Sequence, residues 1–300
     1  MKQFAAFLVS AILLAVYVPM VSAGPVHPYD IKDTVKRVFA AHSGGRLEVD
    51  ADMGNVEVTA GGSKEVRIVV ERIVSVDSRE DAKSILEAHN LALESKGNTV
   101  WVSSRINRDR FSWKRSMDRI RVRIIVEVPE DFDLDISSGA GNVSVVDVSG
   151  FATVKTGAGN IVTGQTSGEM DILTGSGNVD IRTTAGRVRV RNGSGNVTLD
   201  NVEGMIEAET GAGNVTARIV RELDGDSRLT TSAGNIKVLL AQDIGANVSA
   251  VAKVGSCSTD YPLEVTGSWM KKSFDGLING GGPELSLRAN VGNIVLSRLD

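Results

Sequence analysis

Two aspartates in the middle of the chain are the residues best suited to acid–base chemistry. Parallel β-structures that cleave acidic polysaccharides need clustered carboxylates, which act as acid and base or bind calcium. Asp171 and Asp180 are nine residues apart, and no histidine or tyrosine lies between residues 137 and 240. The repeat described below places the two aspartates on different halves of one coil. We therefore predict that the chain is not an enzyme, with a polysaccharide lyase or hydrolase as the alternative.

The stretch 105–123 carries the most distinctive charge pattern of the chain. It holds eight basic and two acidic residues, with two aromatic side chains among them. A basic loop with aromatic side chains is suited to an anionic lipid surface or a polyanionic glycan. The pattern favours a solvated hairpin whose aromatic rings pack on the end of the fold, with binding to an anionic surface as the functional alternative. The candidate residues for binding an anionic surface are Arg105, Arg108, Arg110, Phe111, Trp113, Lys114 and Arg115.

The residues that most often bind metals are few and scattered. His27, His42 and His89 have no metal-ligand spacing. Cys257 is the only cysteine, so no intramolecular disulfide forms. We expect Cys257 to be a small buried residue, with an intermolecular disulfide or a reactive thiol as alternatives. The sequence thus predicts neither a metal site nor a cofactor.

A strict glycine period sets the architecture that positions these side chains. From residue 141 to residue 213 glycine recurs every nine residues, and every second glycine opens a Gly-Asn-(Val/Ile) triplet. The repeat is therefore eighteen residues long and has two nine-residue halves. A period this short is typical of a solenoid, in which each coil stacks on its neighbours. The repeated structural positions are Gly141, Asn142, Gly159, Asn160, Gly177, Asn178, Gly195, Asn196, Gly213 and Asn214.

Residue types within each half-repeat predict short strands. Apolar residues occupy every second position after each glycine, which indicates a strand with one buried face. Outward positions mostly alternate in sign from coil to coil, as in Asp171, Arg189 and Glu207. Facing opposite charges on paired strands stabilise the pairing, so we expect a solvated ladder of ion pairs. A charged ligand face is the alternative.

Two structural roles are possible for the Gly-Asn pair. It favours a tight turn with positive φ, and stacked asparagine amides can hydrogen-bond from coil to coil. A metal or sugar site along the asparagine row is a third possibility. Calcium-binding β-rolls are excluded, because valine or isoleucine occupies the position where their repeat needs aspartate. A nucleotide loop at Gly157-Ala158-Gly159 is excluded because no Gly-Lys-Ser/Thr follows.

Composition and the first residues indicate an exported protein. Residues 1–23 have the form of a secretory signal peptide, with Lys2, an apolar run and the cleavage-site sequence Val21-Ser22-Ala23. No other membrane-spanning run follows, and a net charge of −4 does not favour nucleic-acid binding. We predict an N-terminal β-rich cap with a short helix or loop over 24–136. A regular solenoid over 137–240 and irregular C-terminal coils over 241–300 follow.

These features together resemble one known group of proteins. The sequence is similar to the bacterial putative-adhesin family, an exported β-helix domain of unknown function. The similarity covers about 46–299 and rests on the Gly-Asn-Val coils and three further motifs. These are Ile125-Val126-Glu127-Val128-Pro129, Leu134-Asp135-Ile136-Ser137, and the ending from Phe274-Asp275-Gly276 through Gly281-Gly282-Pro283 to Gly292-Asn293-Ile294. The resemblance implies a parallel β-helix, exported or tethered to a membrane, and brings no catalytic residues.

Sequence and resemblance lead to one expectation about fold and function. We predict an all-β parallel β-helix with eighteen-residue coils, capped by irregular β-segments at both ends. It would be a non-catalytic scaffold of the cell envelope, periplasmic or extracellular, for adhesion or for binding a protein, lipid or polyanion. A lectin-like glycan binder is a further alternative, although aromatic residues are only 4% of the chain. Exposed strand edges also allow self-association.

Overall fold

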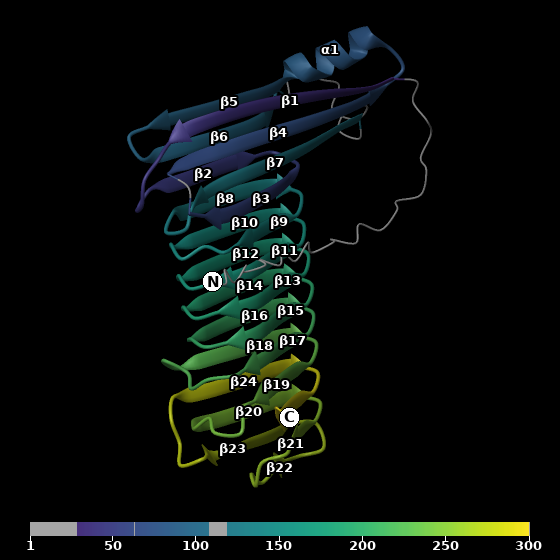
Figure 1. The fold of residues 1–300 in the computed structure, drawn as a ribbon. Coiled ribbons are helices and arrows are strands. Elements are labelled where there is room, and N and C mark those ends of the chain that lie inside the picture. Colours follow the sequence, from purple (N-terminus) through teal and green to yellow (C-terminus); the bar gives the residue numbers. More distant parts are fainter. Residues whose placement is uncertain (1–28, 63, 108–118, 300) are drawn as a thin grey trace, which may run out of the picture.

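The fold consists almost entirely of two long β-sheets that face each other (Figure 1). The computed structural model describes residues 29–62, 64–107 and 119–299. In these residues sheet A has twelve strands, in the spatial order β1 (Tyr29–Ala40), β4 (Glu65–Val76), β7 (Ile120–Pro129), β3 (Asn55–Gly61), β9 (Val143–Val146), β11 (Ile161–Thr166), β13 (Val179–Thr184), β15 (Val197–Val202), β17 (Val215–Ile219), β19 (Ile236–Leu240), β25 (Ile294–Arg298) and β21 (Cys257–Thr259).

Sheet B lies opposite and contains thirteen strands of the described chain. Their order is β22 (Thr266–Gly267), β23 (Lys272–Ile278), β20 (Ala246–Val254), β24 (Glu284–Val291), β18 (Ser227–Ala233), β16 (Ile206–Ala212), β14 (Val188–Ser194), β12 (Met170–Ser176), β10 (Ala152–Ala158), β8 (Asp133–Ala140), β2 (Arg46–Ala51), β6 (Thr99–Ile106) and β5 (His89–Lys96).

Each coil of the repeat gives one strand to each sheet, which confirms the predicted all-β solenoid. Corresponding strands pair in parallel, eighteen residues apart, as in Val154 with Ile172 and Ile172 with Val190. These three side chains have no exposed surface, and the same column continues along the stack. Because side chains alternate along a strand, a slip of one residue would place charged side chains in the core.

The Gly-Asn corner of each coil combines two contacts. Gly177 has φ of 142°, and a Cβ atom there would lie 2.0 Å from the carbonyl oxygen of Gly159, so only glycine fits. The Oδ1 atom of Asn178 accepts a hydrogen bond of 2.9 Å from the backbone N–H of Asn196 on the next coil. The same bond is accepted by Asn55, Asn142, Asn160, Asn196, Asn214, Asn235 and Asn293.

At both ends of the stack the coils do not follow each other in chain order. The coil β2–β3 lies between β6–β7 and β8–β9, and the coil β24–β25 lies between β18–β19 and β20–β21. The triplet Gly292-Asn293-Ile294 comes last among the triplets, yet it occupies the next-to-last coil of the stack. Its asparagine accepts the backbone N–H of Ser256, which belongs to an earlier segment.

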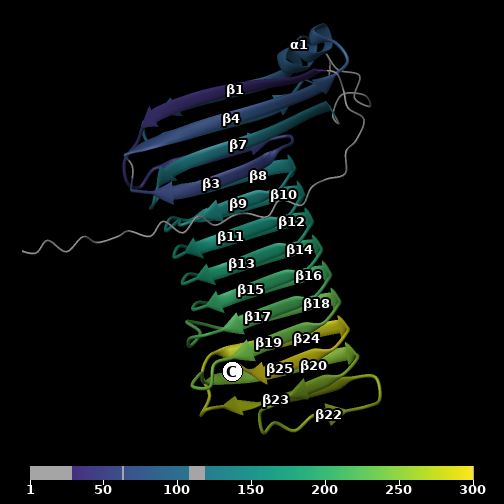
Figure 2. The same cartoon turned by 45° about the vertical axis from the view of Figure 1, so that its right-hand side comes forward.

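The N-terminal end of the stack breaks the parallel pattern (Figure 2). Strand β4 pairs with β7 and β1 pairs with β4, both antiparallel, while β5 pairs antiparallel with β6. Between β4 and β5 the helix α1 (Arg79–Ala88) crosses from one sheet to the other, and the hydroxyl of Ser78 caps its first turn. The short helix or loop expected within the N-terminal cap is therefore a helix, and it is followed by strand β5 from His89.

The Gly-Asn corner yields a stability prediction. Asn178→Ala should lower the free energy of unfolding by about 1 kcal/mol, because one hydrogen bond between coils is lost at an exposed position. Gly177→Ala should cost about 2–5 kcal/mol, because the new methyl group meets a backbone carbonyl at positive φ. Chemical denaturation measures both. The matched control Arg182→Ala changes an exposed side chain of the same coil. Its free energy of unfolding should stay within about 0.5 kcal/mol of that of the parent protein.

Candidate functional site

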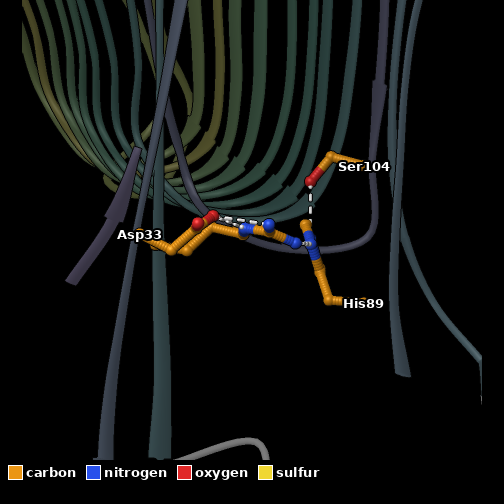
Figure 3. A network of polar contacts seen from close by, with 4 residues as sticks. Asp33, His89 and Ser104 are labelled. Carbon is orange, nitrogen blue, oxygen red and sulfur yellow. Dashed lines mark hydrogen bonds and ion pairs between the residues drawn. The ribbon is translucent and has the colours of Figure 1, made fainter. Parts of the chain in front are cut away.

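A partly buried polar network lies at the N-terminal end of the molecule, between the two sheets. Arg72 of β4 occupies an inward position in a strand whose other inward residues are aliphatic. Its guanidinium Nε donates to Asp33 Oδ2 of β1 at 2.8 Å, and its Nη1 lies 3.3 Å from His89 Nδ1 of β5. The other ring nitrogen of His89 lies 2.9 Å from the hydroxyl of Ser104 on β6. Figure 3 shows these groups meeting between the two sheets.

The network fixes the protonation state of His89. The Nδ1 atom faces a guanidinium that only donates, so Nδ1 accepts and the proton sits on Nε2, directed at Ser104. Burial lowers the pKa of His89 to about 4, and the positive charge of Arg72 acts in the same direction. The carboxylates of Asp52 and Asp33 oppose this shift and are outweighed. At neutral pH His89 is therefore an uncharged donor.

A cleft of about 410 Å³ opens beside this network, along the outer edge of β5. Apolar side chains from facing strands line it, Val35 from β1 and Leu91 and Leu93 from β5. Arg37 of β1 and Glu94 of β5 are exposed at its rim. In the part of the chain that the structure describes, no carboxylate is bonded to Arg37, and its Nη1 donates to the backbone carbonyl of Lys36. Arg72 and His89 of the network line the cleft together with these apolar side chains, and among the described residues Arg37 has no carboxylate partner.

The structure places one of the predicted basic residues in an ion pair. The guanidinium of Arg105 binds the carboxylate of Asp50, a neighbour on sheet B, and this contact raises the pKa of Arg105. Arg108, Arg110, Phe111, Trp113, Lys114 and Arg115 lie outside the described residues. The proposed anionic-surface site is therefore represented only by Arg105, whose charge is already partnered.

The candidate acidic residues of the solenoid do not converge. Asp171 lies on β12 of sheet B opposite Arg189, and Asp180 lies on β13 of sheet A opposite Thr198. Neighbouring charges form pairs along the faces, such as Arg189 with Glu207 at 2.8 Å. Across the described ranges no group of three or more histidine, cysteine, aspartate or glutamate side chains is placed to hold a metal ion.

The remaining candidates have local partners. The buried Cys257 lies 3.3 Å from the backbone carbonyl of Lys272, and burial raises the pKa of its thiol. The Nδ1 atom of His42 lies 2.8 Å from the side-chain oxygen of Asn98. At the level of sequence His89 was considered only as a metal ligand, and its spacing gives no indication of this network. The available signal was Arg72, which interrupts the alternating apolar residues of Val66–Val76.

Two sheets of stacked parallel coils define a β-solenoid protein. The chain belongs to the Toastrack DUF4097 family, whose model matches residues 43–297. This membership confirms the resemblance to the bacterial putative-adhesin family. No curated protein matches the chain. Within the described residues, no helix has the length and apolar character needed to cross a membrane.

Several solved structures are similar to the chain. A putative cell adhesion protein from Clostridium sporogenes has 12% identity and a TM-score of 0.26, with 89% of this chain and 100% of that chain covered. A putative adhesin from Bacteroides fragilis has 12% identity and a TM-score of 0.32, covering 89% and 97%. A putative lipid binding protein from Parabacteroides distasonis has 12% identity and a TM-score of 0.29, also covering 89% and 97%.

The buried histidine predicts a pH dependence of stability. Because the folded-state pKa of His89 is lowered, the unfolded chain takes up a proton that the native protein does not as pH falls from about 6.5 to about 4. Between pH 7 and pH 4.5 this group should remove roughly 2–3 kcal/mol of stability. In His89→Gln the loss over the same interval should be smaller by that amount. Urea unfolding at the two pH values measures the difference.

The exposed histidine provides the control for this experiment. His42→Gln removes a side chain that hydrogen-bonds Asn98 at the surface, and should leave the pH-dependent loss unchanged. An equal loss in the parent protein and in His89→Gln would contradict the assignment of a buried, uncharged His89.

Proposed function

We propose that the protein is a non-catalytic scaffold of the bacterial cell envelope that binds a partner through its surfaces. The observation that carries the proposal is the separation of Asp171 and Asp180 on opposite sheets, because glycoside cleavage needs two carboxyl groups about 5–10 Å apart on one substrate. The signal-like sequence 1–23 supports export to the periplasm or the cell surface. Adhesion is the role suggested by the names of similar proteins.

The shape of the faces also supports binding. Each sheet presents a regular outer surface of strands about 4.8 Å apart, on which side chains recur with the coil period. Ion pairs such as Arg218 with Asp200 at 3.1 Å hold these surfaces in register. Such a surface matches a partner that is itself extended, for example a strand, a glycan chain or a lipid surface.

The basic stretch 105–123 supports an anionic partner as the more specific proposal. Because Asp50 partners Arg105, we assign the contact with an anionic lipid or glycan to Arg108, Arg110, Lys114 and Arg115, with Phe111 and Trp113 supplying apolar contact. Each basic residue near an anionic lipid surface contributes about 1 kcal/mol, so four residues suffice for measurable attachment.

Sedimentation with liposomes tests this assignment. Protein lacking residues 1–23 should pellet with anionic but not with neutral liposomes. Charge reversal of Arg108, Arg110, Lys114 and Arg115 should abolish pelleting, because attraction becomes repulsion. The matched control reverses four exposed cations of the solenoid, Lys155, Arg182, Arg191 and Lys237, and should pellet like the parent protein. Equal pelleting with both liposome types, or no effect of the first set, would sink the anionic-surface proposal.

The enzyme alternative has its own test. Purified protein should release no reducing or unsaturated ends from acidic polysaccharides such as polygalacturonate or alginate. A cleaving activity that disappears in both Asp171→Ala and Asp180→Ala, but persists in the control Asp147→Ala, would overturn the scaffold proposal.

A further inference from the structure

The two sheets have unequal numbers of strands at the N-terminal end. The strands β6 and β7 belong to the same level of the stack, since they pair with β2 and β3 of one coil. Beyond that level sheet A continues with β4 and β1, whereas sheet B continues with β5 alone. Sheet A therefore extends further by one strand, or about 4.8 Å. Figure 2 shows β1 as the outermost strand of this end.

Among the described strands, none consequently lies opposite the inner face of β1. Val35 lines the cleft and is only half-buried, whereas inward residues of the regular coils are fully buried. The helix α1 covers part of the opening, because Ala82 and Ile85 pack into the core. It leaves the length of β5 from Leu91 to Glu94 open to the cleft.

The edge of β5 offers a row of backbone groups to this cleft. In the described part of the chain β5 pairs only with β6, so at about every second residue the N–H and C=O groups point away from the sheet. Among the described residues none of these groups is bonded to another strand. Such an edge is a template for one more strand unless charges, proline or a short length protect it. Here β5 has eight residues and no proline. Its charged side chains, Glu94 and Lys96, are exposed on the outer face, and its inner face carries none after His89.

From these observations we infer that the outer edge of β5 is a strand-addition site for an extended segment of a partner protein. The added strand would become the fourteenth strand of sheet B, and β1 would cover its inner side chains. This proposal rests on the non-catalytic binding function proposed above and names the partner of one surface. Backbone pairing supplies affinity in such complexes, and pockets for alternate side chains supply specificity.

The cleft also specifies which segment fits. Inward side chains of the added strand would meet Val35, Leu91 and Leu93, so they should be apolar. The unpaired guanidinium of Arg37 favours one inward carboxylate, and Glu94 at the outer rim favours a basic residue facing outward. The preferred partner is a strand that alternates apolar and polar residues and contains one inward acidic residue.

The edge of β1 is a poorer receptor for the same segment. A strand added there would have no strand of sheet B opposite it, and its inner face would stay in water. Lys32, Lys36 and Val38 also point outward from β1, where two cations discourage pairing with a basic segment. The shorter sheet is therefore the one that accepts the strand.

A symmetric peptide tests the inference, because it presents the same pattern in either direction. The probe is the acetylated and amidated heptapeptide Lys-Val-Thr-Asp-Thr-Val-Lys, with valine and aspartate on one face. Isothermal titration calorimetry should give saturable binding with a Kd below about 1 mM. Hydrogen exchange should show new protection at alternate amides within residues 89–96. Replacing both threonines of the peptide by proline removes backbone donors and should abolish both signals.

Protein variants separate the cleft from other surfaces. Arg37→Gln should weaken peptide binding about tenfold, because a charge-assisted hydrogen bond is lost. A peptide with asparagine in place of aspartate should bind the parent protein about tenfold more weakly for the same reason. Combining the two changes should give no further loss. Val35→Trp fills the cleft and should prevent binding, with thermal unfolding as the check on its fold. The control Arg182→Gln lies on the solenoid face and should bind like the parent protein.

Three results would overturn the inference. They are no saturable binding, binding without protection of residues 89–96, and β5 protection that rises with protein concentration in the absence of peptide. The last result would assign the edge to a second copy of the chain. Liposome pelleting tests the basic stretch and peptide binding tests β5, so failure of one proposal is distinguishable from failure of the other.

Discussion

The close approach of glycine backbones at one corner of each coil is the constraint on which the rest of the structure depends. A Cβ atom on Gly159, Gly177 or Gly195 would lie 2.0–2.1 Å from the carbonyl oxygen of the preceding coil. The following asparagine accepts a backbone N–H from the next coil, so each corner is fixed to both of its neighbours. This corner sets where each strand starts, so the strands of both sheets pair in the same register. That register places aliphatic side chains in inward columns and charged side chains in outward columns.

That constraint explains how much of the fold could be predicted from the sequence. Glycine at nine-residue spacing and alternating apolar residues are local signals, so the sequence alone predicts the coils and their register. The intercalated coils could not be predicted from the sequence, because Asn293 and Ser256 become neighbours only when distant segments pair. The strand β1 was also missed. Its sequence, from Ile31 to Phe39, carries polar residues at inward positions, which obscures the alternation.

The candidate site lies where the repeat no longer applies. Within the regular coils every inward position has a counterpart on the next coil, so an inward arginine would bury an unpaired charge. At the N-terminal end Asp33 and His89 supply partners for Arg72, and the uneven ends of the two sheets leave space beside them. Sequence patterns could identify the interruption at Arg72, but not its partners, because those come from β1 and β5 through antiparallel pairing.

The intercalated coils also affect the order in which the stack can fold. In an ordinary solenoid the last coil can detach while the others stay paired, since it has a single neighbour. Here β24 and β25 have a neighbour on each side, so their release would separate β18–β19 from β20–β21 in both sheets. A chain that folds in sequence order would leave β20 and β21 without their parallel neighbours until β24 and β25 pair with them. Strands β24 and β25 therefore hold the coil β20–β21 on the stack, which favours slow unfolding and resistance to proteases at this end of the stack.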